Sequence, residues 1–455
     1  MPPNVPAHDF GADALMHGRR VRRLLLLGSG FVAATSLFWG LFFVSHGYWL
    51  VAALDGVAIL LAGATAGLAR RQHLRAASRL LIVVMFVLLC CCAEFFDIPS
   101  AAAPRSMHQY LLAFAVASSL FTHDEPAWLR WGTPLAFACA YAFFASSNAG
   151  WATGLELPDS VRVPGTWINN AIALSFILLT LHVIQSDVRE RNVLEIDLRD
   201  ALLRGELQLH YQPQFDSEQR VVGAEALARW VHPRRGPISP GTFIPLAEGS
   251  GLMPPFGDWA LRTACLQLVA WSHRPETRPL SLAVNVSASQ FGQVDFVARV
   301  FAILDESGAD PAKLKLELTE STLVDDLEDI IAKMNQLKAR GVRFSLDDFG
   351  TGFSSLTYLR RLPLDQLKID QAFVRDMLES RRGAGVAETM VQLGRRLGLE
   401  VIAEGVETEA QRSFLLAIGC RSYQGFLFSP ALPGAEFMAF VASRVPRPGG
   451  EPNAP

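Results

Sequence analysis

Two adjacent aspartates, Asp347 and Asp348, stand where an apolar run meets a loop with two glycines. The run, residues 342–346, alternates apolar and polar residues as a β-strand does. Paired carboxylates at a strand end offer hard oxygen ligands, which suit Mg²⁺ or Mn²⁺ beside phosphate oxygens. The same residues could instead form an Asx turn that caps the next helix. The rest of the chain has to decide between these two interpretations.

Acidic, amide and basic residues recur at the ends of other strand-like runs: Glu225, Asn285, Glu317 with Glu320, Lys368 with Asp370, and Glu404 with Glu407. Amphipathic helical stretches such as 329–340 and 384–397 lie between these runs. Strands that alternate with helices predict a parallel sheet, and 206–441 has room for eight such units. This is the size of an α/β fold of the (β/α)₈, TIM-like barrel type, in which the carboxyl ends of the strands share one face. We therefore expect these side chains to converge.

Carboxylates that face one another across a barrel mouth repel strongly unless cations lie between them, so the pattern favours a metal site. Chemistry at a phosphate group needs an activated water, neutralisation of charge on the phosphoryl oxygens and help for the leaving oxygen. Two divalent ions can supply all three.

Short motifs in a fixed order make this interpretation more specific: Tyr211-Gln212-Pro213, Glu225-Ala226-Leu227 with Arg229-Trp230, Asn285-Val286-Ser287, Glu317-Leu318-Thr319-Glu320, the Asp347-Asp348 loop, Leu367-Lys368-Ile369-Asp370, Glu404-Gly405-Val406-Glu407 and Gln424-Gly425. In order and spacing, the segment of roughly 196–443 resembles the EAL domain family of cyclic-di-GMP phosphodiesterases. Each motif alone is weak evidence, whereas the ordered set is specific.

The resemblance implies a two-ion reaction that opens cyclic-di-GMP to linear pGpG with Mg²⁺ or Mn²⁺, and inhibition by Ca²⁺. It implies metal ligands at Glu225, Asn285, Glu317, Asp347, Asp348 and Glu404, with Asp347 bridging the two ions. Lys368 and Glu404 are both candidates for assisting deprotonation of the attacking water, and Glu320 would anchor the loop 348–355. Substrate contacts would come from Gln212, Leu227, Arg229, Asp370, Glu407 and Gln424.

Each residue taken singly has a simpler interpretation. Lys368 could be a solvated lysine at a helix start, Asn285 could cap a helix, and Glu317 could pair with Lys315. Departures from the family pattern, at Phe353, Arg421, Phe426 and 429–433, fall on the pocket rim and remove no metal ligand. The alternative to the enzyme is an inactive barrel that serves as a cyclic-di-GMP receptor or a protein-interaction module.

The first part of the chain is far more apolar than the rest. Half of all residues are hydrophobic and only 19% are charged. Apolar segments long enough, or nearly so, to cross a bilayer are 24–45, 48–68, 80–96, 108–121, 131–147 and 167–185, of which the fourth is short. A transporter is disfavoured because Asp55 and Glu94 have no basic partner within these spans.

Arginines flank these segments on one side: Arg19, Arg20, Arg22 and Arg23; Arg70, Arg71, Arg75 and Arg79; and Arg189, Arg191 and Arg199. The positive-inside rule then predicts a multi-pass protein of the bacterial cytoplasmic membrane, with both termini and the barrel in the cytoplasm. Cysteines 90–92 could form a metal or redox sensor, although buried cysteine more often serves as small apolar packing.

The expected domains are a cytoplasmic tail (1–23), an α-helical membrane domain with six spans that acts as a sensor (24–185), a linker helix (186–204), the barrel (205–443) and a disordered tail (444–455). The linker leaves no room for a diguanylate cyclase domain. The expected partners are cyclic-di-GMP, membrane lipid and a second copy of the barrel in a homodimer. A formal net charge of −3 and the lack of a basic cluster beside aromatics argue against nucleic-acid polymers.

Overall fold

The computed structural model describes residues 12–122, 125–148, 150–151, 156–323, 326–347, 349 and 359–444. The chain divides into two compact units, residues 1–193 and residues 194–455. Asp348, most of the glycine loop that follows it, the start of the N-terminal tail and the C-terminal tail lie outside the described residues, so the predictions made for them have no structural counterpart here.

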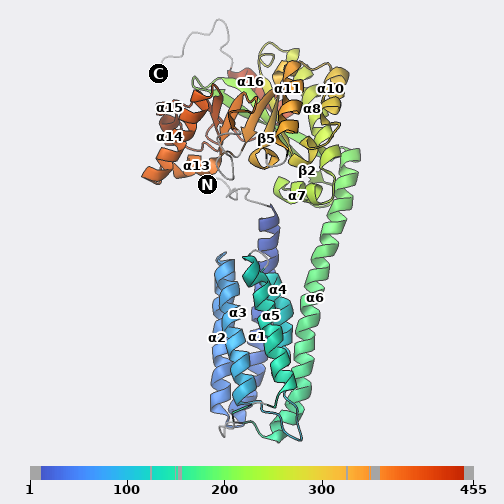
Figure 1. Ribbon diagram of the computed structural model, residues 1–455, viewed down its shortest axis with the longest axis vertical. Helices are drawn as coiled ribbons and strands as arrows, with labels where there is room; N and C mark the ends of the chain where they lie inside the picture. The colour runs from blue at the N-terminus through green and yellow to red at the C-terminus, as the bar shows by residue number, and fades with distance from the viewer. Residues whose placement is uncertain are drawn as a thin grey trace. The chain divides into compact units, whose positions relative to one another are not determined.

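The first unit is built of helices, one at each position where the sequence predicts an apolar span (Figure 1). They are α1 (Ala12–Ser45), α2 (Trp49–Arg70), α3 (Leu74–Phe95), α4 (Gln109–Phe121), α5 (Ala127–Ser146) and α6 (Asp159–Arg204). By length and composition, α1 from Val21 onward, α2, α3 and α6 could each cross a membrane. The helix α4 has only 13 residues, in keeping with its short apolar segment.

A polar network ties the loop between α3 and α4 to the start of α6. Asp97 Oδ2 accepts hydrogen bonds from the backbone N–H groups of Ser106 (2.6 Å) and Met107 (2.7 Å). The other oxygen, Oδ1, lies 3.3 Å from Arg162 Nε on α6. Asn169 lies two turns after Arg162, on the same face of α6. Its side-chain amide donates to Ser106 Oγ and accepts from the Tyr110 hydroxyl. Buried charges here are paired and hydrogen-bonded, which is the condition for burying them without a large cost.

The second unit is a closed barrel of eight strands: β1 (Leu207–Asp216), β2 (Val221–His232), β4 (Ser281–Val286), β5 (Leu314–Thr319), β6 (Arg343–Asp347), β7 (Gln366–Ile369), β8 (Glu400–Ala403) and β9 (Ser422–Tyr423). Two short strands, β3 (Gly236–Ile238) and β10 (Leu432–Pro433), pair with β2 and β1 outside the ring of eight. The longer helices between and after the strands are α7 (Pro240–Gly249), α8 (Met253–Ser272), α10 (Phe296–Ser307), α11 (Leu327–Ala339), α14 (Arg381–Arg396), α15 (Glu409–Ala417) and α16 (Gly434–Arg444). The predicted barrel class is confirmed.

One part of the predicted topology is wrong. The strand β1 runs antiparallel to both of its ring neighbours, β2 and β9, whereas the remaining seven strands are parallel. The cause is local, since only four residues, 217–220, separate β1 from β2 and a parallel crossover needs a dozen or more. Asp216 closes this turn by accepting from the backbone N–H groups of Glu218 and Arg220 at 2.9 Å. A hairpin therefore replaces the first βα unit.

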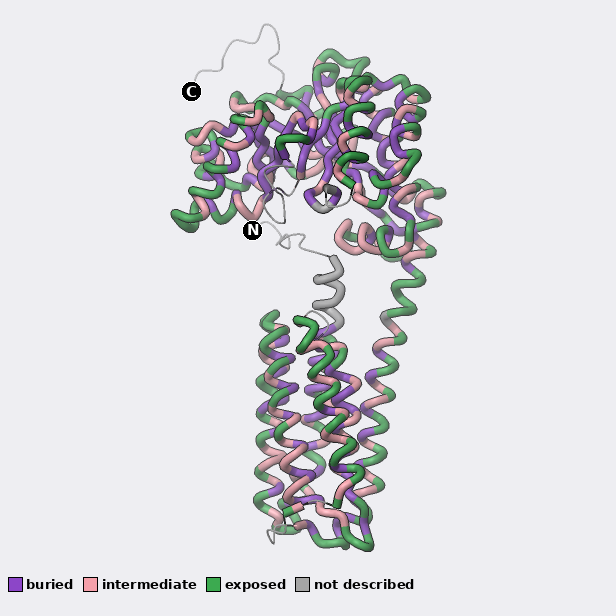
Figure 2. Tube along the Cα trace, viewed as in Figure 1, coloured by how far each residue is buried: buried purple, intermediate pink, exposed green. Residues whose placement is uncertain are grey.

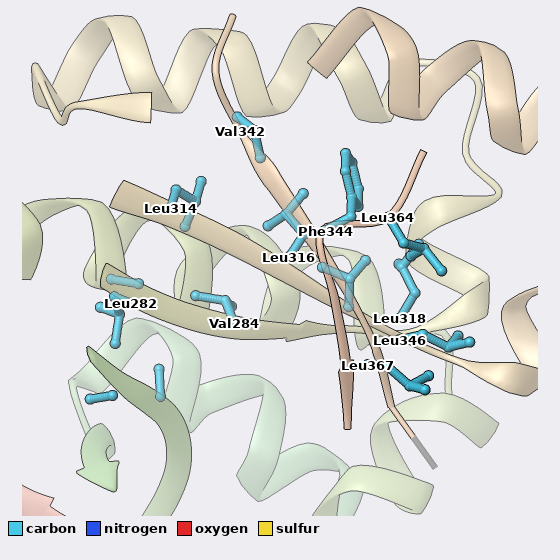
Figure 3. Close-up of a cluster of buried hydrophobic side chains, with 14 of the residues drawn as sticks. Leu282, Val284, Leu314, Leu316, Leu318, Val342, Phe344, Leu346, Leu364 and Leu367 are labelled. Atoms are coloured by element: carbon cyan, nitrogen blue, oxygen red, sulfur yellow. The ribbon is translucent and has the colours of Figure 1, made fainter. Parts of the chain in front are cut away.

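Strand alternation separates the apolar core from the polar barrel interior. On β5, Leu314, Leu316 and Leu318 face the helices and join the main core, where Figure 3 shows them beside residues of β4, β6 and β7. The intervening residues, Lys315 and Glu317, point the other way and bond to side chains of β7. Because successive side chains point to opposite faces of a strand, a strand with both faces buried carries two chemically different rows. Figure 2 shows the strands buried and the outer helix faces exposed.

The last turns of α6 belong to the barrel unit. Leu194, Leu198 and Ala201 are buried in a small apolar cluster with Leu207 and Trp230. Asp197, on the same stretch, lies 3.2 Å from His232 at the end of β2. The C-terminal end of α6 thus packs against the start of β1 and the end of β2.

Candidate functional site

The ammonium group of Lys368 lies at the centre of a carboxylate cluster inside the barrel. Its Nζ is 2.5 Å from Glu404 Oε1 and 2.6 Å from Glu317 Oε2. Asp347 Oδ2 is 3.2 Å away and Glu225 Oε2 is 3.7 Å away. These five side chains come from β2, β5, β6, β7 and the residue that follows β8. Residues up to 179 positions apart in the sequence, Glu225 and Glu404, therefore meet around one nitrogen atom.

The simpler interpretations of single residues fail for this group. Lys368 is 0% exposed, so it is not a solvated lysine at a helix start. Asn285 does not cap the short helix α9 (Ala288–Phe291), whose cap is Ser287; it donates to Glu225 Oε1 at 2.7 Å. Lys315, which could have paired with Glu317, donates instead to Gln366 Oε1 at 2.9 Å.

A row of amides joins the cluster to β1 and β9. Gln424 Nε2 donates to Glu225 Oε2 at 2.5 Å and to Gln212 Oε1 at 3.0 Å. Gln214 Nε2 donates to Gln424 Oε1 at 3.0 Å. Gln212 faces Glu225 directly in the antiparallel register. The pairing of β1 with β2 and with β9 thus brings Gln212 and Gln424, two predicted substrate contacts, to the edge of the carboxylate cluster.

The glycines of two motifs have steric explanations. Gly405 has a φ of +62°, and a Cβ at this position would fall 2.5 Å from the Cβ of Gln371. At Gly425, a Cβ would fall 2.2 Å from the carbonyl oxygen of Val406. Glycine relieves both contacts. The turns that set the direction of Glu404 and Gln424 therefore depend on the residue that follows each of them.

The remaining predicted site residues lie outside this inner cluster. Glu320 is buried at the start of a short 3₁₀ turn (Glu320–Leu323). Asp370 caps the helix α13 (Gln371–Asp376) by accepting from the N–H of Ala372, and Glu407 is exposed. Leu227 and Arg229 follow Glu225 on β2 and are half-buried; Arg229 donates to the backbone carbonyl of Ala228. Asp348 is not among the described residues.

Burial and charge act against each other in the cluster. Burial alone lowers the pKa of Lys368, but the surrounding carboxylates raise it well above its ordinary value. Burial raises the pKa of Glu317 to about 8 despite the attraction of Lys368, and burial also raises the pKa of Glu404. The pKa of Glu225 is lowered, because Lys368 and the hydrogen bonds from Gln424 and Asn285 outweigh its burial. One ammonium group thus does not neutralise four carboxyl groups.

The donor set fits divalent cations. Four carboxyl groups and the Asn285 amide converge from different strands, and they supply the oxygen ligands that Mg²⁺ and Mn²⁺ prefer. Glu317 Oε1 is buried and has no hydrogen-bond partner within the part of the chain that the structure describes. Within that part, no three acidic, histidine or cysteine side chains already form a compact metal-ligating group. The carboxylates are instead oriented toward Lys368.

A second interior layer was not predicted from the sequence. Lys315 Nζ and Ser345 Oγ both donate to Gln366 Oε1, at 2.9 Å and 3.2 Å. These residues stand two positions before Glu317, Asp347 and Lys368 on their strands. Gln214, which orients Gln424, stands two positions after Gln212. The period of two along a strand is the signal that could have found all of them.

Comparison with known proteins agrees with this geometry. The sequence profile of the EAL domain matches residues 195–431, which is more than half of the chain. The chain belongs to the EAL domain family. The bifunctional diguanylate cyclase/cyclic di-GMP phosphodiesterase MucR of Pseudomonas aeruginosa is 44% identical over 258 residues, which cover 56% of this chain and 38% of MucR. The cyclic di-GMP phosphodiesterase NbdA of the same species is 42% identical over 249 residues, covering 54% of this chain and 32% of NbdA.

Solved structures of EAL proteins match the barrel. The MucR phosphodiesterase in complex with c-di-GMP has 45% sequence identity and a TM-score of 0.51, and the match covers 53% of this chain and 98% of that structure. The EAL enzyme Bd1971, bound to cAMP and cyclic-di-GMP, has 28% identity and a TM-score of 0.54, with 63% and 80% covered. The chain spans about a third of the length of the two curated relatives, so the similarity concerns the barrel.

Proposed function

We propose that this EAL protein hydrolyses cyclic-di-GMP to linear pGpG in a reaction that depends on divalent cations. The convergence of Glu225, Glu317, Asp347 and Glu404 around Lys368 carries the proposal. The names of MucR and NbdA, and the c-di-GMP in the MucR structure, support the choice of substrate.

We propose that the site binds two Mg²⁺ or Mn²⁺ ions. The residues that would hold them are Glu225, Asn285, Glu317, Asp347, Asp348 and Glu404. Cations bound there would neutralise charge on the phosphoryl oxygens and supply an activated water. Ca²⁺ should inhibit, because its longer bonds and looser coordination suit this role poorly.

The chain's own residues have separate tasks in this proposal. Lys368 Nζ lies 2.5 Å from Glu404 Oε1 and donates a hydrogen bond to Glu317 Oε2 at 2.6 Å, so the ammonium group is in direct contact with both carboxyl groups. Lys368 and Glu404 are the proposed acid–base element: a deprotonated Glu404 would accept the proton of the attacking water, and the ammonium group of Lys368 would donate a proton or stabilise negative charge. Gln212 and Gln424, held by one another, would orient the substrate from the β1 side, with Leu227, Arg229, Asp370 and Glu407 further out. Glu320 would support the loop that follows Asp348.

The alternative is a barrel that binds cyclic-di-GMP without hydrolysing it. The complete carboxylate set disfavours this alternative, because a receptor has no need for four acidic groups that repel one another. Neither Glu317 nor Glu404 gains stability from burial; both carry raised pKa values. Their presence is better explained by a reaction than by binding alone.

The decisive experiment is an assay of the purified protein with cyclic-di-GMP and Mg²⁺ or Mn²⁺, with linear pGpG measured by chromatography. We expect turnover with either ion, none after chelation, and inhibition by added Ca²⁺. Glu225→Gln, which keeps the shape of the side chain but removes a charge, should abolish turnover. Binding of cyclic-di-GMP without turnover by folded, metal-loaded protein would establish the receptor alternative.

We further propose that α1–α6 place the protein in a bacterial cytoplasmic membrane, with the barrel on the cytoplasmic side, and that this domain regulates a homodimer through α6. Support comes from the apolar spans and from Leu194, Leu198 and Ala201, which join the end of α6 to the barrel core. A rotation of α6 about its axis would change the relative populations of active and inactive barrels.

Insertions between Arg189 and Glu190, ahead of the packed end of α6, test this regulation. Two extra residues turn the helix by about 200°, whereas seven nearly restore its phase. In lipid vesicles, the two-residue insertion should change turnover and the seven-residue insertion should change it much less. Equal effects of the two insertions, or no effect of either, would contradict the proposed coupling.

A further inference from the structure

A cavity of about 80 Å³ lies inside the helical bundle of the first unit. Residues of α1, α2, α3, α4 and α6 line it, and its walls are apolar except in a few places. Five of its lining side chains are aromatic: Phe31, Trp39, Tyr110, Phe114 and Phe176. The rings of Phe31 and Phe114 pack against that of Phe176, with centroids 4.9 Å and 5.5 Å apart. Its volume is about half that of an engineered cavity that holds benzene.

Asp55, on α2, is the one charged side chain among the described residues that line this cavity. Its Oδ2 is enclosed and has no hydrogen-bond partner within the described part of the chain. The helix α1 passes this carboxyl group at Gly40, where a Cβ would come within 3.3 Å of Asp55 Cβ. An ionised carboxylate in apolar surroundings is costly unless a cation or hydrogen-bond donors compensate it. Such a residue inside a candidate membrane span marks a functional position.

We propose that this cavity binds a small apolar molecule that carries a protonated amine. The ammonium group would pair with Asp55, and the aromatic rings would add cation–π attraction while they enclose the alkyl part. No lysine, arginine or histidine is among the described lining residues, so the cation has to come from outside the chain. The small volume restricts the ligand to about the size of a short alkylamine.

This site is independent of the reaction proposed for the barrel, and its test does not use turnover. The probe is n-butylamine, titrated into the full-length protein in lipid nanodiscs and followed by saturation-transfer NMR. The neutral control is n-pentane, which has the same number of heavy atoms, and empty nanodiscs report partition into lipid. We expect saturable binding of the amine to the protein and at least about tenfold weaker binding of the hydrocarbon.

Two variants and one matched control assign the binding to the cavity. Asp55→Asn keeps the shape of the side chain and should weaken amine binding at least about tenfold. Glu94→Gln removes an acid of α3 that does not line the cavity, and it should change the affinity less than about twofold. Ala58→Leu fills the cavity but keeps the carboxyl group, and it should also abolish binding.

Four results would overturn the proposal: no saturable binding of butylamine, equal binding of pentane, wild-type affinity in Asp55→Asn, or undiminished binding in Ala58→Leu. If Asp55→Asn fails to give a monodisperse protein in gel filtration, Ala58→Leu decides the question. Ala58 is buried on the same helix and lines the cavity. Undiminished binding of the amine by this filled variant would show that the ligand lies elsewhere.

Discussion

Two lysines are buried in the same barrel, in adjacent interior layers, and their surroundings differ. Lys315 is 4% exposed and donates to the amide oxygen of Gln366. Lys368 is 0% exposed and lies among four carboxyl groups. Burial lowers the pKa of Lys315, whereas the carboxylates raise that of Lys368.

The difference between these layers shows that burial alone does not indicate a functional lysine. In the layer of Lys315, the cation donates to the neutral amide oxygen of Gln366, which ties β5 to β7, and the nearby carboxyl group of Glu400 attracts it, so acidic groups do not crowd around this lysine in excess. In the layer of Lys368, acidic groups outnumber the cation, and this excess can be balanced only by protons or further cations. Under the proposed function, the layer of Lys315 would contribute to stability and the layer of Lys368 to the reaction.

The largest expected effect is on turnover in Lys368→Met. This change removes the ammonium group and keeps an apolar side chain of similar length, so proton transfer and charge stabilisation are lost together. We expect kcat for cyclic-di-GMP to fall by at least about 10²-fold. The matched change in the other layer, Lys315→Met, should leave kcat within about twofold. Equal losses of kcat in the two variants would remove the distinction between the layers.

A smaller effect is expected on the stability of Gln366→Leu. The substitution keeps the volume of the side chain but takes away the acceptor of Lys315 and Ser345. Leaving a buried ammonium group without this acceptor should lower the free energy of unfolding by about 2–4 kcal/mol. Urea unfolding of a fragment from Leu194 onward measures it, since a stand-alone EAL domain has been solved for MucR. An unchanged unfolding midpoint would mean that Lys315 needs no acceptor.

The smallest expected effect is on the double variant Lys315→Met, Gln366→Leu. Both partners of the hydrogen bond are then apolar, and replacing a whole buried polar pair is often close to neutral. The free energy of unfolding should lie within about 1 kcal/mol of the wild-type value. A loss in the double variant as large as that in Gln366→Leu alone would show that the cost comes from packing and not from the unpaired charge.

Most of the cluster could be predicted from the sequence because strand ends in a parallel barrel meet at one face. Asn285, Glu317, Asp347 and Lys368 all stand within the last three residues of a strand, and the structure brings them together. Their roles in a reaction stay predictions. The layer beneath them was missed because Lys315 and Gln366 lie earlier in their strands than these residues, and Lys315 was considered only as a partner of Glu317.

The reversed strand β1 was missed for a different reason. The number of strand-like and helical segments does not show the direction of a strand. Direction depends on the length of the connection, here residues 217–220. Two supporting residues were missed because their contacts depend on this pairing. The side chain of Gln214 donates to Gln424, and the backbone carbonyl of Ser429 accepts from Gln212. Helical periodicity alone likewise did not show that the end of α6 packs into the barrel.

The direction of β1 decides at which end of the barrel the chain enters. In a barrel of eight parallel strands, the first strand begins at the face opposite the carboxyl ends, and an upstream helix arrives on the side remote from the reaction. Here Leu207, the first residue of β1, pairs with Trp230, which lies beyond Glu225 toward the carboxyl end of β2. The incoming helix therefore reaches the barrel on the face where substrate binds in this fold. Gln212, five residues further on, already borders the carboxylates, so a displacement of the incoming helix has only a short path to the site.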